Sequence, residues 1–329
     1  MHVGRLLSAA SGVVRRAMST TVAVLLPCYN EEAAIGATVA GFRAALPDAT
    51  IYVYDNNSSD RTIEVARAAG AVVRSERIQG KGAVVRRMFA DVDADIYVMA
   101  DGDATYDAAA APELVARLLD EQLDMVVGQR VSEAALAYRR GHRFGNAMLT
   151  GMLARLFGRS FTDILSGYRV FSRRFVKSFP SLSAGFEIET EISVHALELR
   201  MPVAEVTTRY FARPEGSASK LSTYGDGFRI ARTIATLYRI ERPLWFFGAI
   251  GLLLALIAVV LAVPIVITYL HTGLVPRFPT AILATGLVIL ASLCLFSGLI
   301  LDTVVRGRRE VRRLAYLAHP APGSGWIAR

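Results

Sequence analysis

Residues 22–32 read VAVLLPCYNEE, a short apolar run that reaches a proline and continues into polar residues. An apolar, β-branched run bounded by turn-forming residues is typical of a buried β-strand, which we place at residues 22–26. The same pattern recurs along the next hundred or so residues. It predicts further strands at residues 51–55, 71–74, 95–100 and 124–128.

Stretches with helical periodicity separate the predicted strands. We expect helices at residues 31–45, 60–69, 81–92 and 112–122. Asn30 and Ser59 are candidate N-caps of the first two, and Pro112 suits the first turn of the fourth. This alternation of strands and helices predicts a Rossmann-like α/β fold, with a mostly parallel sheet covered by helices on both faces.

Two long runs without a charged residue follow the α/β region. Residues 244–270 and 281–301 contain 27 and 21 residues, and about 20 apolar residues are needed to cross the hydrocarbon of a bilayer. Pro264 lies inside the first run, where it can kink the helix or shorten the spanning part. We therefore expect a transmembrane hairpin. A pair of buried core helices is the alternative, but the chain has no comparably apolar surface to cover them.

Basic residues flank the two apolar runs. The chain carries 37 Lys and Arg against 29 Asp and Glu, a formal net charge of +8. Arginines gather before the first run and after the second, whereas the connecting loop holds only Arg277. By the positive-inside rule, we expect the α/β domain and both termini in the cytoplasm, with the hairpin in the cell (inner) membrane. The arginines do not alternate with exposed aromatic residues, so no nucleic-acid partner is expected.

The flanking segments complete the predicted organisation. Residues 229–243 place apolar side chains on one helical side and arginines on another, as in an amphipathic helix on an anionic lipid surface. A solvated helix packed on the domain is the alternative. Five parts are expected: a disordered basic leader (1–20), a catalytic domain (21–228), the amphipathic helix (229–243), two transmembrane helices (244–301) and a basic cytoplasmic tail (302–329).

Cys28 and Cys294 are the only cysteines and lie far apart in the sequence, so a disulfide framework is not expected. This favours a reduced compartment for the catalytic domain. The sequence leaves open whether the chain forms a homo-oligomer.

Polar residues follow the predicted strands, at the edge where parallel α/β sheets bind ligands. Asp101 and Asp103 stand one residue apart after the fourth strand, so both can reach a hard divalent cation that holds a diphosphate. Gly80 and Lys81 open the third helix, where a glycine allows close backbone approach and free amides can face a phosphate. A lone Asp-x-Asp is more often an ordinary polar turn, so the surrounding motifs decide its meaning.

Several motifs follow one another in the order and approximate spacing of a known enzyme family. They are Pro27-x-Tyr29-Asn30-Glu31, Asp55-x-x-Ser58-x-Asp60, Asp101-x-Asp103, DILSGYR at 163–169, GFEIE at 185–189 and GSASKL at 216–221. With these motifs, residues 21 to about 225 resemble family 2 glycosyltransferases of the GT-A fold. The later motifs look like those of dolichyl- or polyprenyl-phosphate sugar synthases. The runs DGDATY at 101–106 and FEIETE at 186–191 are most similar to the branch that uses UDP-sugars.

The resemblance implies a role for each matched residue. It implies nucleotide-sugar binding by Pro27, Tyr29, Asn30, Glu31, Asp55, Asn57, Gly80, Lys81, Asp101, Gly102, Asp103, Arg213 and Lys220. It further implies that Asp101 and Asp103 hold Mg²⁺ or Mn²⁺, and that the acceptor phosphate is bound by Arg130, Arg143 and Ser166. The implied catalytic set is Asp101, Asp103, Asp163 and Arg130. Asp163 and Glu189 are assigned to positioning the sugar or helix termini.

The chain departs from the family at two places. Thr105 stands where the mannosyl branch often has Gln or Ser, which puts a contribution of that side chain to the metal in doubt. Residues 216–220 form a loop one residue longer than the family's common form, which blurs the matching of its serines.

A phosphate acceptor needs no dedicated general base, because a phosphate monoester with a second pKa of about 6 is already largely ionised near neutrality. The predicted reaction is the inverting, metal-dependent transfer of a sugar to a polyprenyl phosphate at the cytoplasmic membrane face. The expected donor is a nucleotide-sugar, UDP-linked by preference. Open alternatives are GDP-mannose as donor, a hydroxyl acceptor with Asp163 as base, and a non-catalytic nucleotide-sugar binder. A processive polysaccharide synthase is disfavoured because neither Trp245 nor Trp326 lies in a Gln-x-x-Arg-Trp motif.

Overall fold

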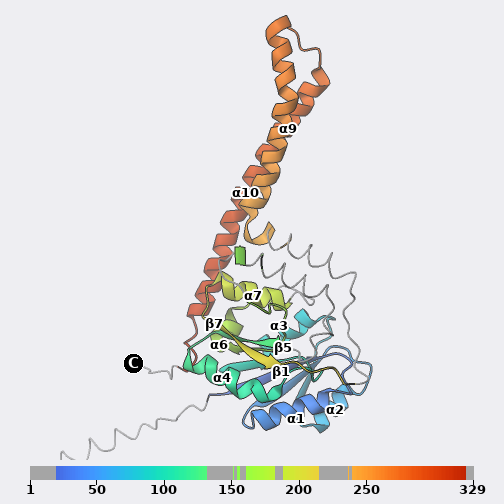
Figure 1. The fold of residues 1–329 in the computed structure, drawn as a ribbon, viewed down its shortest axis with the longest axis vertical. Helices are drawn as coiled ribbons and strands as arrows, with labels where there is room; N and C mark the ends of the chain where they lie inside the picture. Colours follow the sequence, from blue (N-terminus) through green and yellow to red (C-terminus); the bar gives the residue numbers. More distant parts are fainter. Residues whose placement is uncertain are drawn as a thin grey trace, which may run out of the picture. The chain divides into compact units, whose positions relative to one another are not determined.

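The computed structural model describes residues 20–131, 151, 154–155, 161–181, 188–214, 236 and 239–323 (Figure 1). The described residues fall into two compact units. The sheet unit contains residues 20–131, 161–181, 188–214 and 315–323. The hairpin unit contains the remaining described residues, chiefly 239–314.

One seven-stranded sheet, with strand order β3-β2-β1-β4-β6-β5-β7, forms the centre of the sheet unit. The strands are β1 (Val22–Cys28), β2 (Thr50–Asp55), β3 (Val72–Ser75), β4 (Ile96–Met99), β5 (Met125–Val131), β6 (Arg169–Ser172) and β7 (Val203–Arg209). In the register, Leu25 of β1 lies opposite Tyr52 of β2 and Met99 of β4. Only β6 is antiparallel, to both β4 and β5, so β5 again runs parallel to β4. The predicted α/β fold with a mostly parallel sheet is confirmed.

Helices cover both faces of this sheet (Figure 1). One face carries α1 (Ile35–Ala45), α2 (Thr62–Ala68) and α4 (Ala111–Asp120), with the short 3₁₀ turn η2 (Ala108–Ala110) beside α1. The other face carries α3 (Lys81–Asp91), α6 (Arg173–Ser178) and α7 (Ile188–Glu198). This three-layer arrangement buries the apolar strands from both sides, as the near-continuous apolar runs of the sequence require.

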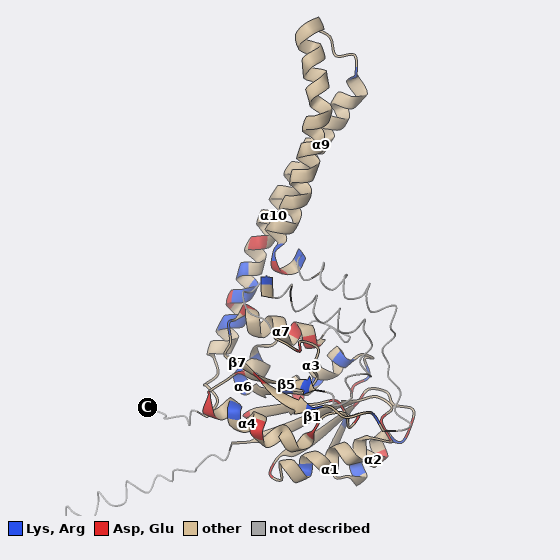
Figure 2. Cartoon of the chain, in the orientation of Figure 1, with Lys and Arg blue, Asp and Glu red and all other residues tan. Residues whose placement is uncertain are grey.

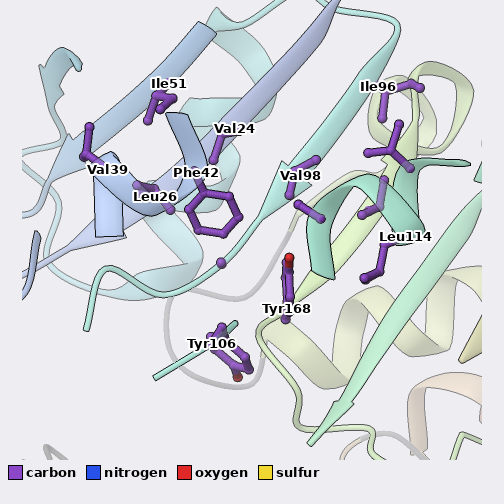
Figure 3. Close-up of a cluster of buried hydrophobic side chains, with 14 of the residues drawn as sticks. Val24, Leu26, Val39, Phe42, Ile51, Ile96, Val98, Tyr106, Leu114 and Tyr168 are labelled. Atoms are coloured by element: carbon purple, nitrogen blue, oxygen red, sulfur yellow. The ribbon is translucent and has the colours of Figure 1, made fainter. Parts of the chain in front are cut away.

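The core between the sheet and the α1 face is fully buried and joins the strands to the residues beyond their carboxyl ends (Figure 3). Phe42 of α1 meets the ring of Tyr168 edge-on, with ring centroids 6.1 Å apart. The ring centroid of Tyr168 in turn lies 5.4 Å from that of Tyr106. Edge-to-face aromatic pairs of this kind contribute about 0.5–1.5 kcal/mol beyond the area that they bury. The segments that follow β4 and precede β6 are therefore fixed to the core by aromatic packing.

The five predicted strands are confirmed to within a few residues at their ends, whereas β6 and β7 were not predicted. The predicted caps of the first two helices are wrong. Helix α1 begins at Ile35 after Ala34, and α2 begins at Thr62 after Arg61, in both cases without a side-chain cap. The Asn30 carboxamide instead accepts a hydrogen bond from the Ser59 amide, which joins two loops rather than capping a helix. Pro112 does lie in the first turn of α4.

Two long helices make up the hairpin unit, α9 (Pro243–Thr272) and α10 (Phe278–Leu317). Both are long and apolar enough to cross a membrane, and only 11% and 17% of their most apolar windows are buried in the protein. This exposure speaks against the alternative of buried core helices. In Figure 2 the charged residues of α10 gather toward its C-terminal part, beyond the apolar run. Helix α9 continues through Pro264, and α10 continues to Leu317, so the start of the predicted tail is helical.

Small residues line the seam between α9 and α10. The buried positions on α10 recur every seven residues and are Ala284, Ala291, Gly298 and Val305; Gly251 and Ala258 of α9 follow the same spacing. A Cβ atom at Gly251 would lie 2.9 Å from the Ala291 carbonyl oxygen. Small residues on a seven-residue repeat let two apolar helices approach closely where the solvent is lipid.

Several predicted parts lie outside the described residues, so the five-part division of the chain stays a prediction. They are the leader up to residue 19 and most of the amphipathic segment, of which residues 239–241 are helical. Glu241 is buried and pairs with Arg309 of α10 at 2.9 Å, so this segment is tied to the hairpin unit.

Candidate active site

The carboxyl ends of β1, β2, β4, β5 and β7 meet at one edge of the sheet, and the start of antiparallel β6 meets them there. Most of the predicted site residues follow these strand ends directly. The sheet topology therefore brings together segments that lie more than 150 residues apart, from Pro27 to Arg213. This is the edge at which ligands bind in open α/β sheets.

Hydrogen bonds join the loop after β1 to the loop after β2. The Asn30 amide donates to Ser58 Oγ at 2.8 Å, and the Glu31 amide donates to Thr62 Oγ1 at 2.8 Å. Asn30 has a positive φ of 53°, a conformation that asparagine tolerates better than most residues. These hydrogen bonds fix the two predicted nucleotide-binding loops relative to each other.

Asp55 ends β2 with a buried carboxylate that is only 2% exposed. Its Oδ2 accepts a hydrogen bond from the Ser58 amide at 3.2 Å, while its Oδ1 has no hydrogen-bond partner among the described residues. An unpartnered buried acceptor is costly. A ligand with an N–H donor, such as a nucleobase, would satisfy it.

The neighbouring Asn56, which was not predicted, shapes the segment that leads into α3. Its Nδ2 donates to the carbonyls of Glu76 and Ile78, both at 2.9 Å, and its Oδ1 accepts from the Gly80 amide at 2.7 Å. Asn57, which was predicted, donates to the Arg77 carbonyl and to Gln79 Oε1, both at 3.0 Å. Both asparagines lie in the motif after β2. The sequence alone does not distinguish an asparagine that holds the backbone in place from one that binds a ligand.

Lys81, the first residue of α3, lies between two carboxylates. Its Nζ is 2.5 Å from Asp101 Oδ1 and 2.5 Å from Glu189 Oε1. Burial disfavours the charged ammonium, but the charges of Asp101 and Glu189 outweigh that effect and raise the pKa of Lys81. Glu189, at the N-terminal end of α7, is therefore drawn into the site through Lys81.

Gly102 separates Asp101 and Asp103 where the loop after β4 passes the end of β1. A Cβ atom at this position would lie 2.3 Å from Cys28 Sγ, closer than real Cβ atoms approach, so any larger residue would require the buried sulfur to move. Asp103 is 3% exposed, and its Oδ1 accepts from Thr105 Oγ1 at 2.6 Å while Arg213 lies 2.7 Å from its Oδ2. The Thr105 hydroxyl thus supports Asp103 within this loop.

The charge of Asp103 is unfavourable in the structure as it stands. Burial, and next to it the negative charge of Asp101, raise the pKa of Asp103, against the opposing hydrogen bond of Thr105 and the charge of Arg213. A divalent cation would relieve both causes at once, because it would neutralise the two carboxylates together.

The residues present fit such a cation. Two carboxylates with oxygen donors are the ligands that Mg²⁺ and Mn²⁺ prefer, and Mg²⁺ sites usually complete their shell with water and substrate phosphates. Among the described residues, no group of three or more His, Cys, Asp and Glu side chains could hold a metal alone. The remaining ligands would therefore come from a diphosphate and water.

Arg130, at the end of β5, forms a two-pronged ion pair with Asp163. Arg130 Nε donates to Asp163 Oδ2 and Nη2 donates to Oδ1, both at 2.7 Å, and the Arg130 amide also donates to Oδ2 at 3.2 Å. The guanidinium lies 5.6 Å from the ring centre of Tyr210. Asp163 therefore orients Arg130 with both of its oxygens, a geometry that favours a positioning role.

Arg169, which was not predicted, fixes the segment 163–168 by hydrogen bonds to its carbonyls. It is fully buried and donates to the carbonyls of Ser166 and Ile164 and to Ser193 Oγ. Burial lowers the pKa of Arg169 to about 10. The Ser166 side chain is also fully buried and donates to the Gly128 carbonyl at 2.6 Å, which favours a structural role over the predicted contact with a phosphate.

The described site thus unites the predicted residues of the β1, β2 and β4 loops with Lys81, Arg130, Asp163 and Arg213. Tyr106 joins them through its hydroxyl, which accepts from the Gly167 amide at 2.8 Å. Two predicted residues, Arg143 and Lys220, lie outside the described residues. Buried residues such as Tyr106 and Arg169 carry no signal in a single sequence that separates them from ordinary core.

Known proteins are similar to this chain in sequence. Residues 23–179 match the model of the family described as Glycosyl transferase family 2. Glycosyltransferase AglJ of Haloferax volcanii is 35% identical over 232 residues, which cover 70% of this chain and 76% of the relative. A dolichyl-phosphate hexose transferase of the same organism is 28% identical over 221 residues, which cover 67% of this chain and 95% of the relative.

Solved structures show the same fold. The glucosyl-3-phosphoglycerate synthase of Mycobacterium tuberculosis, crystallised with Mn²⁺, UDP-glucose and phosphoglyceric acid, matches with a TM-score of 0.55 and 25% sequence identity. The match covers 67% of this chain and 79% of that one. The family model, the sequence relatives and the fold agree, and the chain belongs to glycosyltransferase family 2.

Proposed function

We propose that this glycosyltransferase moves a sugar, with inversion and with the help of a divalent cation, from a nucleotide-sugar to a polyprenyl phosphate at the cytoplasmic face of a membrane. The observation that carries the proposal is the pair Asp101 and Asp103, set at the carboxyl edge of the sheet in a chain that also has two membrane-length apolar helices. A relative named as a dolichyl-phosphate hexose transferase supports the lipid phosphate as acceptor.

The donor would be held by the braced loops after β1 and β2 and by the loop after β4. Asp55 Oδ1 would accept from the nucleobase, and Pro27, Tyr29 and Glu31 would line the nucleotide pocket. Asp101 and Asp103 would bind Mg²⁺ or Mn²⁺, which offsets the negative charge that builds on the departing diphosphate. A structural neighbour crystallised with UDP-glucose favours a UDP-linked donor over GDP-mannose.

The acceptor phosphate would be bound by Arg130, whose planar guanidinium suits a phosphate oxygen pair. Asp163 holds this guanidinium at 2.7 Å with each oxygen, so it would aim Arg130 at the phosphate. The same engagement leaves Asp163 poorly suited to remove a proton. A phosphate acceptor fits this geometry, because it attacks as an ionised oxygen and needs no base.

The hairpin would keep the enzyme on the membrane that contains its acceptor. Helices α9 and α10 expose apolar residues along their length, as lipid-facing helices do, and basic residues follow the apolar run of α10. With both ends of the hairpin in the cytoplasm, the sheet unit would have access to soluble nucleotide-sugars in the cytoplasm. It would also have access to the lipid phosphates of the cytoplasmic leaflet. Confinement to a surface raises the effective concentration of the acceptor.

A donor and metal panel tests the proposed reaction. Full-length protein in detergent receives radiolabelled UDP-sugars or GDP-mannose, a short polyprenyl phosphate, and either Mg²⁺, Mn²⁺ or EDTA. We expect label in the organic phase with a UDP-sugar and a metal, and none with EDTA. Transfer that is undiminished in EDTA would reject the metal, and transfer from GDP-mannose alone would reject the UDP donor.

A further inference from the structure

The buried ammonium of Lys81 bridges two carboxylates from different elements, one open to a ligand and one closed. Its Nζ is 2.5 Å from Asp101 Oδ1 and equally close to Glu189 Oε1. The side chain of Asp101 is 30% exposed, whereas that of Glu189 is 6% exposed. A ligand that enters the site can therefore reach Asp101, while Glu189 stays with Lys81 beneath it.

Lys81 occupies one oxygen of Asp101, Oδ1, which a divalent cation at this carboxylate could also use. Two cations cannot share one carboxylate in a buried site without strong repulsion, because the Coulomb energy between charges rises as the local dielectric falls. A metal that takes this oxygen would therefore displace the ammonium from it.

We propose that Lys81 is an internal counter-ion that the divalent cation displaces from Asp101, and that Glu189 is the positioning residue that retains Lys81 afterwards. This inference rests on the proposed metal-dependent function. Without metal, Lys81 neutralises a carboxylate that would otherwise be half-buried and unpaired. When the metal binds, Lys81 exchanges only one of its two partners and keeps the other.

The geometry predicts opposite effects for the two residues on metal affinity. Removing the ammonium takes away the competitor of the metal, so the affinity should rise. Removing the charge of Glu189 leaves Lys81 with Asp101 as its one carboxylate partner among the described residues, so the metal should bind less tightly although Glu189 does not touch it. A lysine that merely stabilised the fold would show neither pattern.

Binding of Mn²⁺ alone, without nucleotide, measures these effects independently of turnover. Mn²⁺ is titrated at about pH 8, where carboxylates are ionised, into the full-length protein in detergent, and free Mn²⁺ is followed by its EPR signal. Lys81→Met should bind Mn²⁺ about tenfold more tightly than the wild type, a change of about 1.4 kcal/mol. Lys81→Arg should stay near the wild type, because it keeps the charge. Unchanged or weaker binding in Lys81→Met overturns the inference.

A double-mutant cycle isolates the role of Glu189. Glu189→Gln alone should weaken Mn²⁺ binding several-fold, and it should change nothing in the Lys81→Met background. An equal loss in both backgrounds would make Glu189 an ordinary nearby charge and would reject its positioning role. Lys177→Met is the matched control, because Lys177 bonds the carbonyls of Phe89 and Val92 at 3.2 and 3.1 Å, away from the aspartates, and it should leave Mn²⁺ binding unchanged.

The inference and the proposed function fail in different experiments. A wild-type enzyme that turns over with Mn²⁺, together with a Lys81→Met variant of unchanged Mn²⁺ affinity, rejects the counter-ion and leaves the proposed function intact. A wild-type protein that transfers label equally with and without metal rejects the metal-dependent function itself.

Discussion

At the scale of single residues, the site is built from charges that neutralise one another until a ligand arrives. Asp103 pairs with Arg213 at 2.7 Å and accepts the Thr105 hydroxyl, yet its pKa is still raised, first by burial. A carboxyl whose folded-state pKa is raised stabilises the fold at low pH and loses that contribution as the pH rises through the folded value. The structure thus holds the carboxyl of Asp103 at a position where its negative charge disfavours folding, as expected of a side chain that serves a ligand.

Asp103→Asn should separate function from stability. Loss of a metal ligand should lower metal-dependent kcat/KM by about 100-fold or more. The unfolding temperature should not fall near neutral pH, and its decline above about pH 4, where aspartate ordinarily ionises, should become shallower than in the wild type. Asp107→Asn is the control, because Asp107 caps η2 through the Ala109 amide. Full activity in Asp103→Asn would remove this carboxylate from the mechanism.

Asp163→Asn tests whether Asp163 positions Arg130 or acts as a base. An amide keeps one hydrogen-bond acceptor but loses the charge that orients the guanidinium, so KM for the lipid phosphate should rise about tenfold. The pH at which kcat falls on the acidic side should stay the same as in the wild type. A fall in kcat of several orders of magnitude, with loss of that pH dependence, would identify Asp163 as a base and favour a hydroxyl acceptor.

At the scale of elements, close approaches decide where the loops and helices can lie. The loop after β4 passes so near the end of β1 that a Cβ at Gly102 would meet Cys28 Sγ at 2.3 Å. Gly102→Ala should therefore shift the aspartates and destabilise the fold by about 1–3 kcal/mol, the usual range for overpacking. The pair Gly102→Ala with Cys28→Ala should regain part of both activity and unfolding temperature. No recovery would show that the backbone at residue 102, rather than the sulfur, requires glycine.

The helical hairpin depends on close approach in the same way. Gly251 faces the Ala291 carbonyl, whereas a Cβ at Gly248 of the same helix would meet nothing within 4 Å. Gly251→Leu should separate α9 from α10. It should lower the free energy of unfolding of the protein in detergent by about 1–3 kcal/mol, the usual range for overpacking in a core. Gly248→Leu should be neutral. Equal effects at both positions would contradict the packing described here.

At the scale of the whole molecule, the sequence predicted the parts that follow from periodicity and missed those that follow from tertiary contact. Strands β1 to β5 were predictable because each contains a short apolar, β-branched run between helical stretches, and the two long helices because each contains a long uncharged run. Strand β6 (RVFS) lies outside the regular alternation of strands and helices in which the equally short β3 and β4 were predicted. Strand β7 alternates Val, Glu and Thr too weakly to stand out from a loop.

The candidate site shows the same division. Asp101, Asp103 and Asp55 could be proposed as site residues because each stands at or just after the end of a strand, in a motif of the family. The ion pairs of Lys81 with Glu189 and of Arg130 with Asp163 join residues that lie 108 and 33 positions apart, and no local pattern encodes such a pairing. The prediction of Asn30 as a helix cap was wrong for a related reason. Its side chain accepts a hydrogen bond from the Ser59 amide in the neighbouring loop instead of from an amide of α1.

The identity of the acceptor tests the central claim most directly. The purified full-length protein receives one labelled nucleotide-sugar, a divalent metal, and either a polyprenyl phosphate or the polyprenol of the same chain length, and the lipid product is identified by mass spectrometry. The account predicts a polyprenyl-phosphate-sugar from the first acceptor and no product from the second. Transfer to the polyprenol hydroxyl, or to neither lipid under conditions where the donor is bound, would contradict it.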